Sequence, residues 1–167
     1  MEEEEFVFRP LISPSDKAFK DKVGVEVWER MKSKAFRDDG HKCCGCGFEP
    51  YDVDPNDVLD IHVVEENEES SEDSIIRTTC KLCHIIEHGD VAMEGGYVAL
   101  VNSYFTQGEI VNICRNRELA HHIEKGEIRY IKKPFQEFLE ELKSGRAKEG
   151  KVKFVLTEKY LISIGIH

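Results

Sequence analysis

An α+β fold is predicted for this chain of 167 residues by three features. Two short apolar segments, 58–64 and 97–101, are predicted to be strands. Other segments repeat apolar residues at helical spacing. Two C-x-x-C pairs supply four thiols in the first half of the chain. With 40% apolar residues, a chain of this length can bury a substantial core.

The first predicted helix begins at an N-cap formed by Ser15 and Asp16 and ends near Phe36. Residues 1–14 are expected to be an acidic lead-in. The apolar positions of the helix recur in steps of four, which predicts one buried stripe (Phe19, Val23, Val27, Met31 and Ala35). Gly24 weakens this prediction in the middle of the helix.

The strand 58–64 follows the first C-x-x-C, and the acidic stretch 65–74 is predicted to be a solvated loop. A short helix is expected to begin near the second C-x-x-C. This helix would carry Cys83, the last cysteine of the second pair, and two histidines, His84 and His88. Those histidines are four residues apart, a spacing that places both on one helical face.

In the second half, the strand 97–101 is followed by a capping-box pattern, Thr106 to Glu109, which predicts a helix through about Lys125. A further helix is expected over 134–144. Residues 151–164 could form a strand or a short helix. We therefore expect a single domain, with a zinc-binding part at 15–125 and a helical extension at 126–167.

The two C-x-x-C pairs predict a structural zinc site. Their members lie about 33 residues apart and provide the four thiolates of a closed tetrahedral site (Cys43, Cys46, Cys80 and Cys83). Disulfides are the alternative, but nothing in the sequence marks a secreted protein. Cys44 and Cys114 are expected to be buried thiols outside the site.

Charge argues against nucleic acid as a partner. The chain has a net charge of −10, and residues 43–90 hold thirteen acidic and two basic residues. A phosphate backbone would be repelled by such a surface. No apolar run reaches the roughly 20 residues of a membrane helix, and the first residues are acidic. A cytoplasmic protein without membrane insertion is therefore expected.

The order C-x-x-C-G, a strand with His62, and C-x-x-C-H-x-x-x-H resembles the zinc-supported HNH endonuclease fold, a β-hairpin and a helix around a metal. The resemblance implies a ββα core, four cysteines on structural zinc, and a catalytic divalent metal between strand and helix. Here that metal would involve His62 and His88, or a second site formed by His62, His84 and His88.

Two chemical parts of that family are missing. The position of the general base is Val63, which cannot take a proton, and the position of the central asparagine is Ile75. The resemblance therefore implies a degenerate nuclease core. If the core is still active, His62 and His88 are its expected catalytic residues.

A second resemblance covers about residues 27–119. The sequence around Trp28, the knuckle 43–48, and the blocks 95–100 and 106–110 are similar to the IcmJ/DotN family of type IV secretion adaptors. It implies a non-catalytic protein that binds a protein partner, in that family a segment of the coupling ATPase. An HNH-type nuclease stays open as an alternative. So does a phage or mobile-element protein that binds and modulates a host complex.

Overall fold

The computed structural model describes residues 16–143 and 152–166, and the chain divides into two compact units, Met1–Glu87 and His88–His167. Helices and strands occur in both units, which confirms the α+β class. The predicted domain limits, at 14/15 and 125/126, stay predictions. Within the described residues, no helix is both long and apolar enough to span a membrane.

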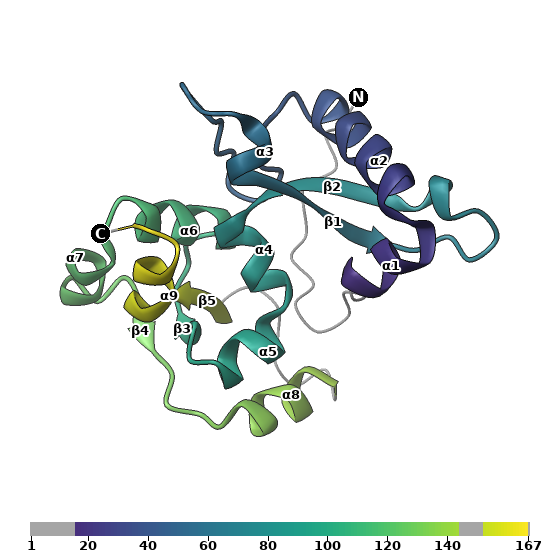
Figure 1. Cartoon of the computed structure of the whole chain (residues 1–167). Helices are drawn as coiled ribbons and strands as arrows, with labels where there is room; N and C mark the ends of the chain where they lie inside the picture. The colour runs from purple at the N-terminus through teal and green to yellow at the C-terminus, as the bar shows by residue number, and fades with distance from the viewer. Residues whose placement is uncertain (1–15, 144–151, 167) are drawn as a thin grey trace. The chain divides into compact units, whose positions relative to one another are not determined.

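The first unit is built around an antiparallel hairpin of β1 (Leu59–Glu65) and β2 (Ile75–Cys80) (Figure 1). Leu59 pairs with Cys80 at one end of the hairpin, and the register shifts between Val63 and Glu65. The predicted loop 65–74 lies at the other end and contains a 3-10 turn, Ser71–Asp73. Helix α4 (Lys81–Glu87) follows β2 directly, so that the second thiol pair spans a strand end and a helix start.

The predicted helix from Ser15 to Phe36 is wrong as a single element. The chain forms α1 (Asp16–Val23) and α2 (Val25–Asp38), with Gly24 between them at a φ of 85°. A positive φ of this kind ends a right-handed helix and is tolerated by glycine. The break redirects α2, whose buried residues are Trp28, Ala35 and Phe36.

Phe19 of α1 and Trp28 of α2 are both buried, and their ring centroids lie 6.2 Å apart. The Nζ atom of Lys20 lies 5.8 Å from the Trp28 ring centroid. At the other end of α2, the Asp39 carboxylate accepts a hydrogen bond from the Thr78 backbone N–H at 2.8 Å. The two helices are thus packed together, and α2 is tied to β2.

A short helix, α3 (Pro55–Val58), precedes β1. Its N-cap is Asp54, whose side chain accepts a hydrogen bond from the backbone N–H of Asn56 at 2.9 Å. This cap stabilises the start of α3, in the segment that connects the first thiol pair to the hairpin.

The second unit contains a three-stranded antiparallel sheet in the order β4-β3-β5. Its strands are β3 (Val98–Asn102), β4 (Arg129–Tyr130) and β5 (Val152–Leu156), and its helices are α5 (Gly89–Glu94), α6 (Gln107–Arg115), α7 (Leu119–Glu124), α8 (Phe135–Lys143) and α9 (Glu158–Ser163). The predicted capping box is present: Thr106 accepts from the Glu109 backbone N–H, and Glu109 accepts from that of Thr106.

The predicted helix through Lys125 is also wrong as one element, because α6 ends at Arg115 and α7 begins at Leu119. Arg117, between them, has a φ of 61°, which a continuous helix does not allow. The segment 151–164, open between strand and helix in the sequence, contains both β5 and α9. The part of the chain predicted as an extension thus contributes β5, which pairs with β3.

Candidate metal centres

Four cysteine sulfurs gather in the first unit, as the sequence predicts. The Sγ atoms of Cys43, Cys46, Cys80 and Cys83 all lie within 4.8 Å of one another, and those of Cys46 and Cys80 are 3.6 Å apart. In a tetrahedral zinc–thiolate site, bonds of about 2.3 Å place the sulfurs about 3.8 Å apart. The cluster therefore has the dimensions of a four-thiolate metal site.

Backbone hydrogen bonds hold the first thiol pair in a tight knuckle. The Gly47 N–H donates to the Cys43 carbonyl at 2.9 Å, and Gly47 has a φ of 76°. The Cys44 N–H donates to the carbonyl of Thr78 at 2.9 Å, which joins the knuckle to β2. Because β2 ends at Cys80, this bond brings the first pair to the second.

Protons are shared unevenly among the four thiols. Hydrogen bonds with neighbouring sulfurs, together with burial, raise the pKa of Cys43 and Cys83, whereas the hydrogen bond with Cys43 lowers the pKa of Cys46. Four adjacent thiolates would repel one another without a cation. A metal ion removes this conflict because it replaces the protons and balances the charge.

The other two cysteines lie outside the cluster, as predicted; Cys114 is buried, whereas Cys44 is only half-buried, contrary to the prediction. Burial, followed by the charge of Asp39, raises the pKa of Cys44 to about 12. Burial raises the pKa of Cys114 to about 11. Both are therefore neutral thiols near pH 7, which argues against a role as nucleophile. Among the described residues, which include all six cysteines, no disulfide is formed.

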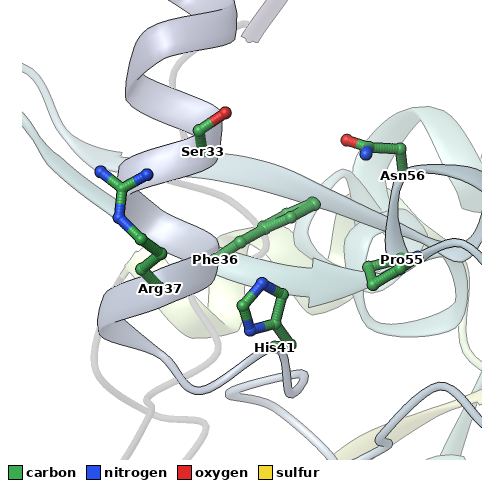
Figure 2. Close-up of a pocket in the computed structure, with 6 residues that line it drawn as sticks. All are labelled: Ser33, Phe36, Arg37, His41, Pro55 and Asn56. Atoms are coloured by element: carbon green, nitrogen blue, oxygen red, sulfur yellow. The ribbon is translucent and has the colours of Figure 1, made fainter.

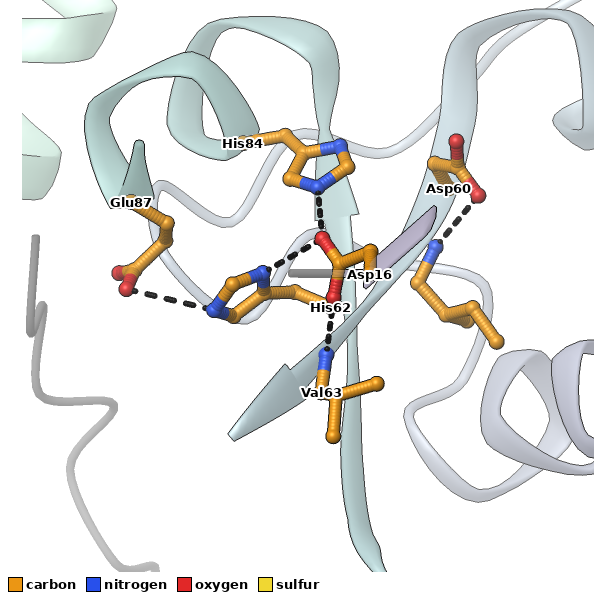
Figure 3. Close-up of polar contacts among 7 residues, drawn as sticks. Asp16, Asp60, His62, Val63, His84 and Glu87 are labelled. Atoms are coloured by element: carbon orange, nitrogen blue, oxygen red, sulfur yellow. Dashed lines mark hydrogen bonds and ion pairs between the residues drawn. The ribbon is translucent and has the colours of Figure 1, made fainter. Parts of the chain in front are cut away.

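A second cluster joins the three predicted histidines, His62, His84 and His88, to a carboxylate that sequence reasoning missed. His62 Nδ1 and His84 Nε2 both donate to Asp16 Oδ2, at 3.0 and 2.6 Å (Figure 3). Asp16 Oδ1 accepts from the Val63 N–H at 2.9 Å. The ligand atoms of Asp16, His62, His84 and His88 all lie within 4.8 Å of one another. The first three residues come from α1, β1 and α4, and His88 directly follows α4.

This second cluster is partly buried and has two carboxylates, Asp16 and the neighbouring Glu87. His62 is 1% exposed and Glu87 2%. Glu87 Oε2 lies 3.6 Å from His62 Nε2, on the side of the imidazole away from Asp16 (Figure 3). For His84, burial opposes protonation, but the hydrogen bond and charge of Asp16 outweigh it and raise the pKa. The cluster therefore favours positive charge between its carboxylates.

The other positions singled out by the resemblance are placed as follows. Val63 is 0% exposed, and Ile75 is an exposed residue at the start of β2. His88 is the first residue of the second unit and the N-cap of α5, with non-helical φ and ψ of −106° and 41°. The expectation that His84 and His88 share one helix is therefore wrong, because α4 ends at Glu87.

A cavity of about 310 Å³ lies beside α2 and α3, lined by Ser33, Phe36, Arg37, His41, Pro55 and Asn56 (Figure 2). The ring of His41 packs edge-on against that of Phe36, with centroids 6.2 Å apart. The segment that leads to Pro55 exposes Tyr51 and Val53, at 86% and 50%. The segment that leads to this cavity-lining proline therefore carries accessible apolar side chains.

His121 and His122, predicted to be surface or core residues, lie on α7 in the second unit. The Nδ1 atom of His122 donates to the carboxylate of Glu127 at 2.5 Å.

No protein-family model and no curated protein matches this sequence. The site is therefore interpreted from its own geometry. Asp16 was identified in the sequence only as part of a helix N-cap, since no spacing pattern connects it with residues 46 and 68 positions away.

Proposed function

We propose that this chain is a non-catalytic adaptor whose first unit is a degenerate HNH-like ββα core stabilised by zinc. The arrangement β1, β2 and α4, with thiols before β1 and at the junction of β2 with α4, supports this interpretation. Zn²⁺ is the ion proposed for the four thiolates because closed Cys₄ sites are typical of structural zinc. Its binding would stabilise the folded first unit.

One observation carries the non-catalytic part of the proposal. The strand positions that face the metal and the substrate in an HNH nuclease are buried here: Val63 has no exposed surface and His62 almost none. Asp16 accepts hydrogen bonds from both the Val63 N–H and the His62 ring. A general base must reach the water that attacks the phosphate, and neither residue presents an accessible base.

The acidic character of the first unit indicates the chemistry of the partner. Exposed acidic residues follow the knuckle, namely Glu49, Asp52, Asp54 and Asp57. They flank the exposed side chains of Tyr51 and Val53. Such a segment complements a basic protein segment that carries an apolar anchor, because charge steers the encounter and apolar contact supplies affinity.

Two measurements test the proposal. In a plasmid-nicking assay with magnesium, manganese or nickel, we expect no cleavage above that of a His62→Ala variant. Cleavage that disappears in His62→Ala would contradict the non-catalytic interpretation. Co-purification from the native source should yield a stoichiometric protein partner that is lost with Tyr51→Ala/Val53→Ala. Glu94→Ala, at an exposed position on α5 in the second unit, is a matched control that should retain the partner.

A metal-dependent HNH-type nuclease is the second candidate, favoured by the proximity of His62 and His84. In that function, His62 and His88 would serve a divalent ion that activates water. The nicking assay separates the two candidates, since the nuclease requires cation-dependent cleavage that His62→Ala abolishes.

A further inference from the structure

The cavity lined by α2, the turn after it and the start of α3 has the size of a small-molecule site. Its volume of about 310 Å³ equals that of about ten water molecules and lies at the lower end of the range for ligand pockets. Figure 2 shows the ring of Phe36 extending from α2 toward Pro55 and Asn56, with the His41 ring beside it. The cavity therefore has room for a ligand of about one ring, with an aromatic side chain to pack against it.

The α2 side of this cavity carries an arginine that is available to a ligand. Arg30 and Lys34, on the same helix, form ion pairs with Glu72 and Asp38. No described residue accepts a hydrogen bond from the Arg37 guanidinium or forms an ion pair with it. A guanidinium presents a planar fork of N–H donors that matches the two oxygens of a carboxylate. This end of the cavity therefore suits a carboxylate.

His41 is positioned at the cavity by an unusual turn. Gly40 and His41 have φ angles of 65° and 57°, and the His41 N–H donates to the carbonyl of Phe36 at 2.8 Å. A residue with a side chain pays a cost in this left-handed region, and such residues are concentrated at binding sites. The turn sets the imidazole edge-on to the Phe36 ring, with centroids 6.2 Å apart. In either tautomer the imidazole supplies a ring N–H as a second donor.

The α3 side of the cavity offers a hydrogen-bond acceptor instead. The side-chain amide of Asn56 donates to Asp54 Oδ1 at 3.1 Å, and the same oxygen accepts from the Asn56 backbone N–H at 2.9 Å. These bonds fix the orientation of the amide, whose own oxygen then serves as the acceptor on this side. A ligand that spans the cavity meets N–H donors at one end and an acceptor at the other.

We propose that this cavity binds a small aromatic carboxylate whose ring carries a hydrogen-bond donor such as a hydroxyl group. The carboxylate lies against Arg37 and His41. The ring packs on Phe36 and Pro55, and the hydroxyl donates to the side-chain oxygen of Asn56. The site is separate from both ligand clusters of metal type and does not depend on the proposed adaptor function.

Calorimetric titration of the full chain with para-hydroxybenzoate tests the proposal. We expect one site per chain with a Kd below about 1 mM, which is within reach of a ligand of about ten non-hydrogen atoms. Acetate lacks the ring, and para-hydroxybenzamide lacks the charge. Each should bind at least about tenfold more weakly, because one loses apolar contact and the other the charged hydrogen bonds.

Two variants and a matched control locate the site. Arg37→Gln should weaken binding about tenfold or more, since it removes hydrogen bonds to a charged group. Arg30→Gln removes an exposed arginine from the same helix and should bind like the wild type. His41→Gly removes the imidazole but tolerates the left-handed backbone, so affinity should fall while the unfolding temperature does not.

Three results would overturn the proposal. The first is a wild-type Kd above about 1 mM for para-hydroxybenzoate. The second is an Arg37→Gln variant that binds it within about threefold of wild type. The third is an equal loss of affinity in Arg30→Gln and Arg37→Gln, which would show general attraction of an anion to α2 and no defined site.

Discussion

The two ligand clusters of the first unit are built in opposite ways. The sulfur cluster uses two pairs of cysteines, each held within a few residues by a knuckle or by the junction of β2 and α4. The second cluster, Asp16, His62, His84 and His88, takes single residues from α1, β1 and α4 and the residue that follows α4. One is assembled mainly by local backbone geometry, and the other by tertiary packing.

This difference has an energetic consequence. A site made of local pairs can form as soon as the two knuckles meet, so metal binding can drive folding. A site made of three separate elements requires α1 to be packed on the hairpin first. We therefore expect the sulfur cluster to determine whether the first unit folds, and the Asp16 cluster to determine how firmly α1 is held.

The largest expected effect comes from breaking the sulfur cluster. Cys80→Ser should abolish stoichiometric zinc binding and unfold the first unit, because structural zinc contributes about 10 to 16 kcal/mol in zinc-finger peptides and whole domains are stable by only about 5 to 15 kcal/mol. Metal analysis and circular dichroism measure both changes. Cys44→Ser, in the same knuckle but outside the cluster, should keep about one zinc ion per chain. Equal zinc content in both variants would contradict the assignment.

A smaller loss is expected at the second cluster. Asp16→Ala removes the acceptor for two imidazoles and one backbone N–H and leaves buried polar groups without it. Removing one partner of a buried charged pair costs about 3 kcal/mol. Denaturant unfolding at low free-metal concentration measures this cost, with zinc retained in the Cys₄ site. Asp21→Ala should stay within about 0.5 kcal/mol of wild type. An equal loss of stability in Asp16→Ala and Asp21→Ala would show that the second cluster makes no specific contribution to the stability of the first unit.

The second unit provides a perturbation that should leave both clusters intact. Thr106→Ala removes the side-chain cap of α6 and should destabilise the second unit by about 1 kcal/mol. Zinc content should not change. Thr106→Ser, which keeps the hydroxyl, should restore most of the stability. Metal loss in Thr106→Ala would show that the clusters depend on the second unit.

The smallest effect is a pH dependence in the second unit. The hydrogen bond from His122 lowers the pKa of Glu127 below its ordinary value of 4.5. A carboxyl with a lowered pKa stabilises the fold above that ordinary value, and the contribution is lost as the pH falls through the lowered pKa. Glu127→Gln should therefore be less stable than wild type near pH 6, and the difference should disappear in acid. A stability difference between Glu127→Gln and wild type that grows on acidification would contradict a stabilising interaction between His122 and Glu127.

Local signals in the sequence predicted a good part of the fold. The thiol pairs, the strand 59–65 and the capping box at Thr106 each depend on residues within a few positions of one another. The residue pattern alone does not predict strand β2, although the HNH resemblance implies a hairpin, because its exposed Ile75 and polar Arg77, Thr78 and Thr79 show no clear alternation. Both threonines are buried in the structure. The helix breaks at Gly24 and Arg117 depend on single backbone angles.

The candidate site, like the fold, was predictable only where its residues form a local pattern in the sequence. Spacing predicted the four cysteines, and the resemblance pointed to His62, His84 and His88. Asp16 could not be found in this way, because its role depends on how α1 packs after the break at Gly24. A continuous helix would have directed the first turn elsewhere.

The contact between Phe19 and Trp28 makes the packing of α1 against α2 measurable. Trp28 is the only tryptophan in the chain, and it lies against α1, the helix that carries Asp16. Its intrinsic fluorescence should therefore report the undocking of α1 as a red shift of the emission, without any label. A single spectrum could follow the seating of this helix while the rest of the chain stays folded.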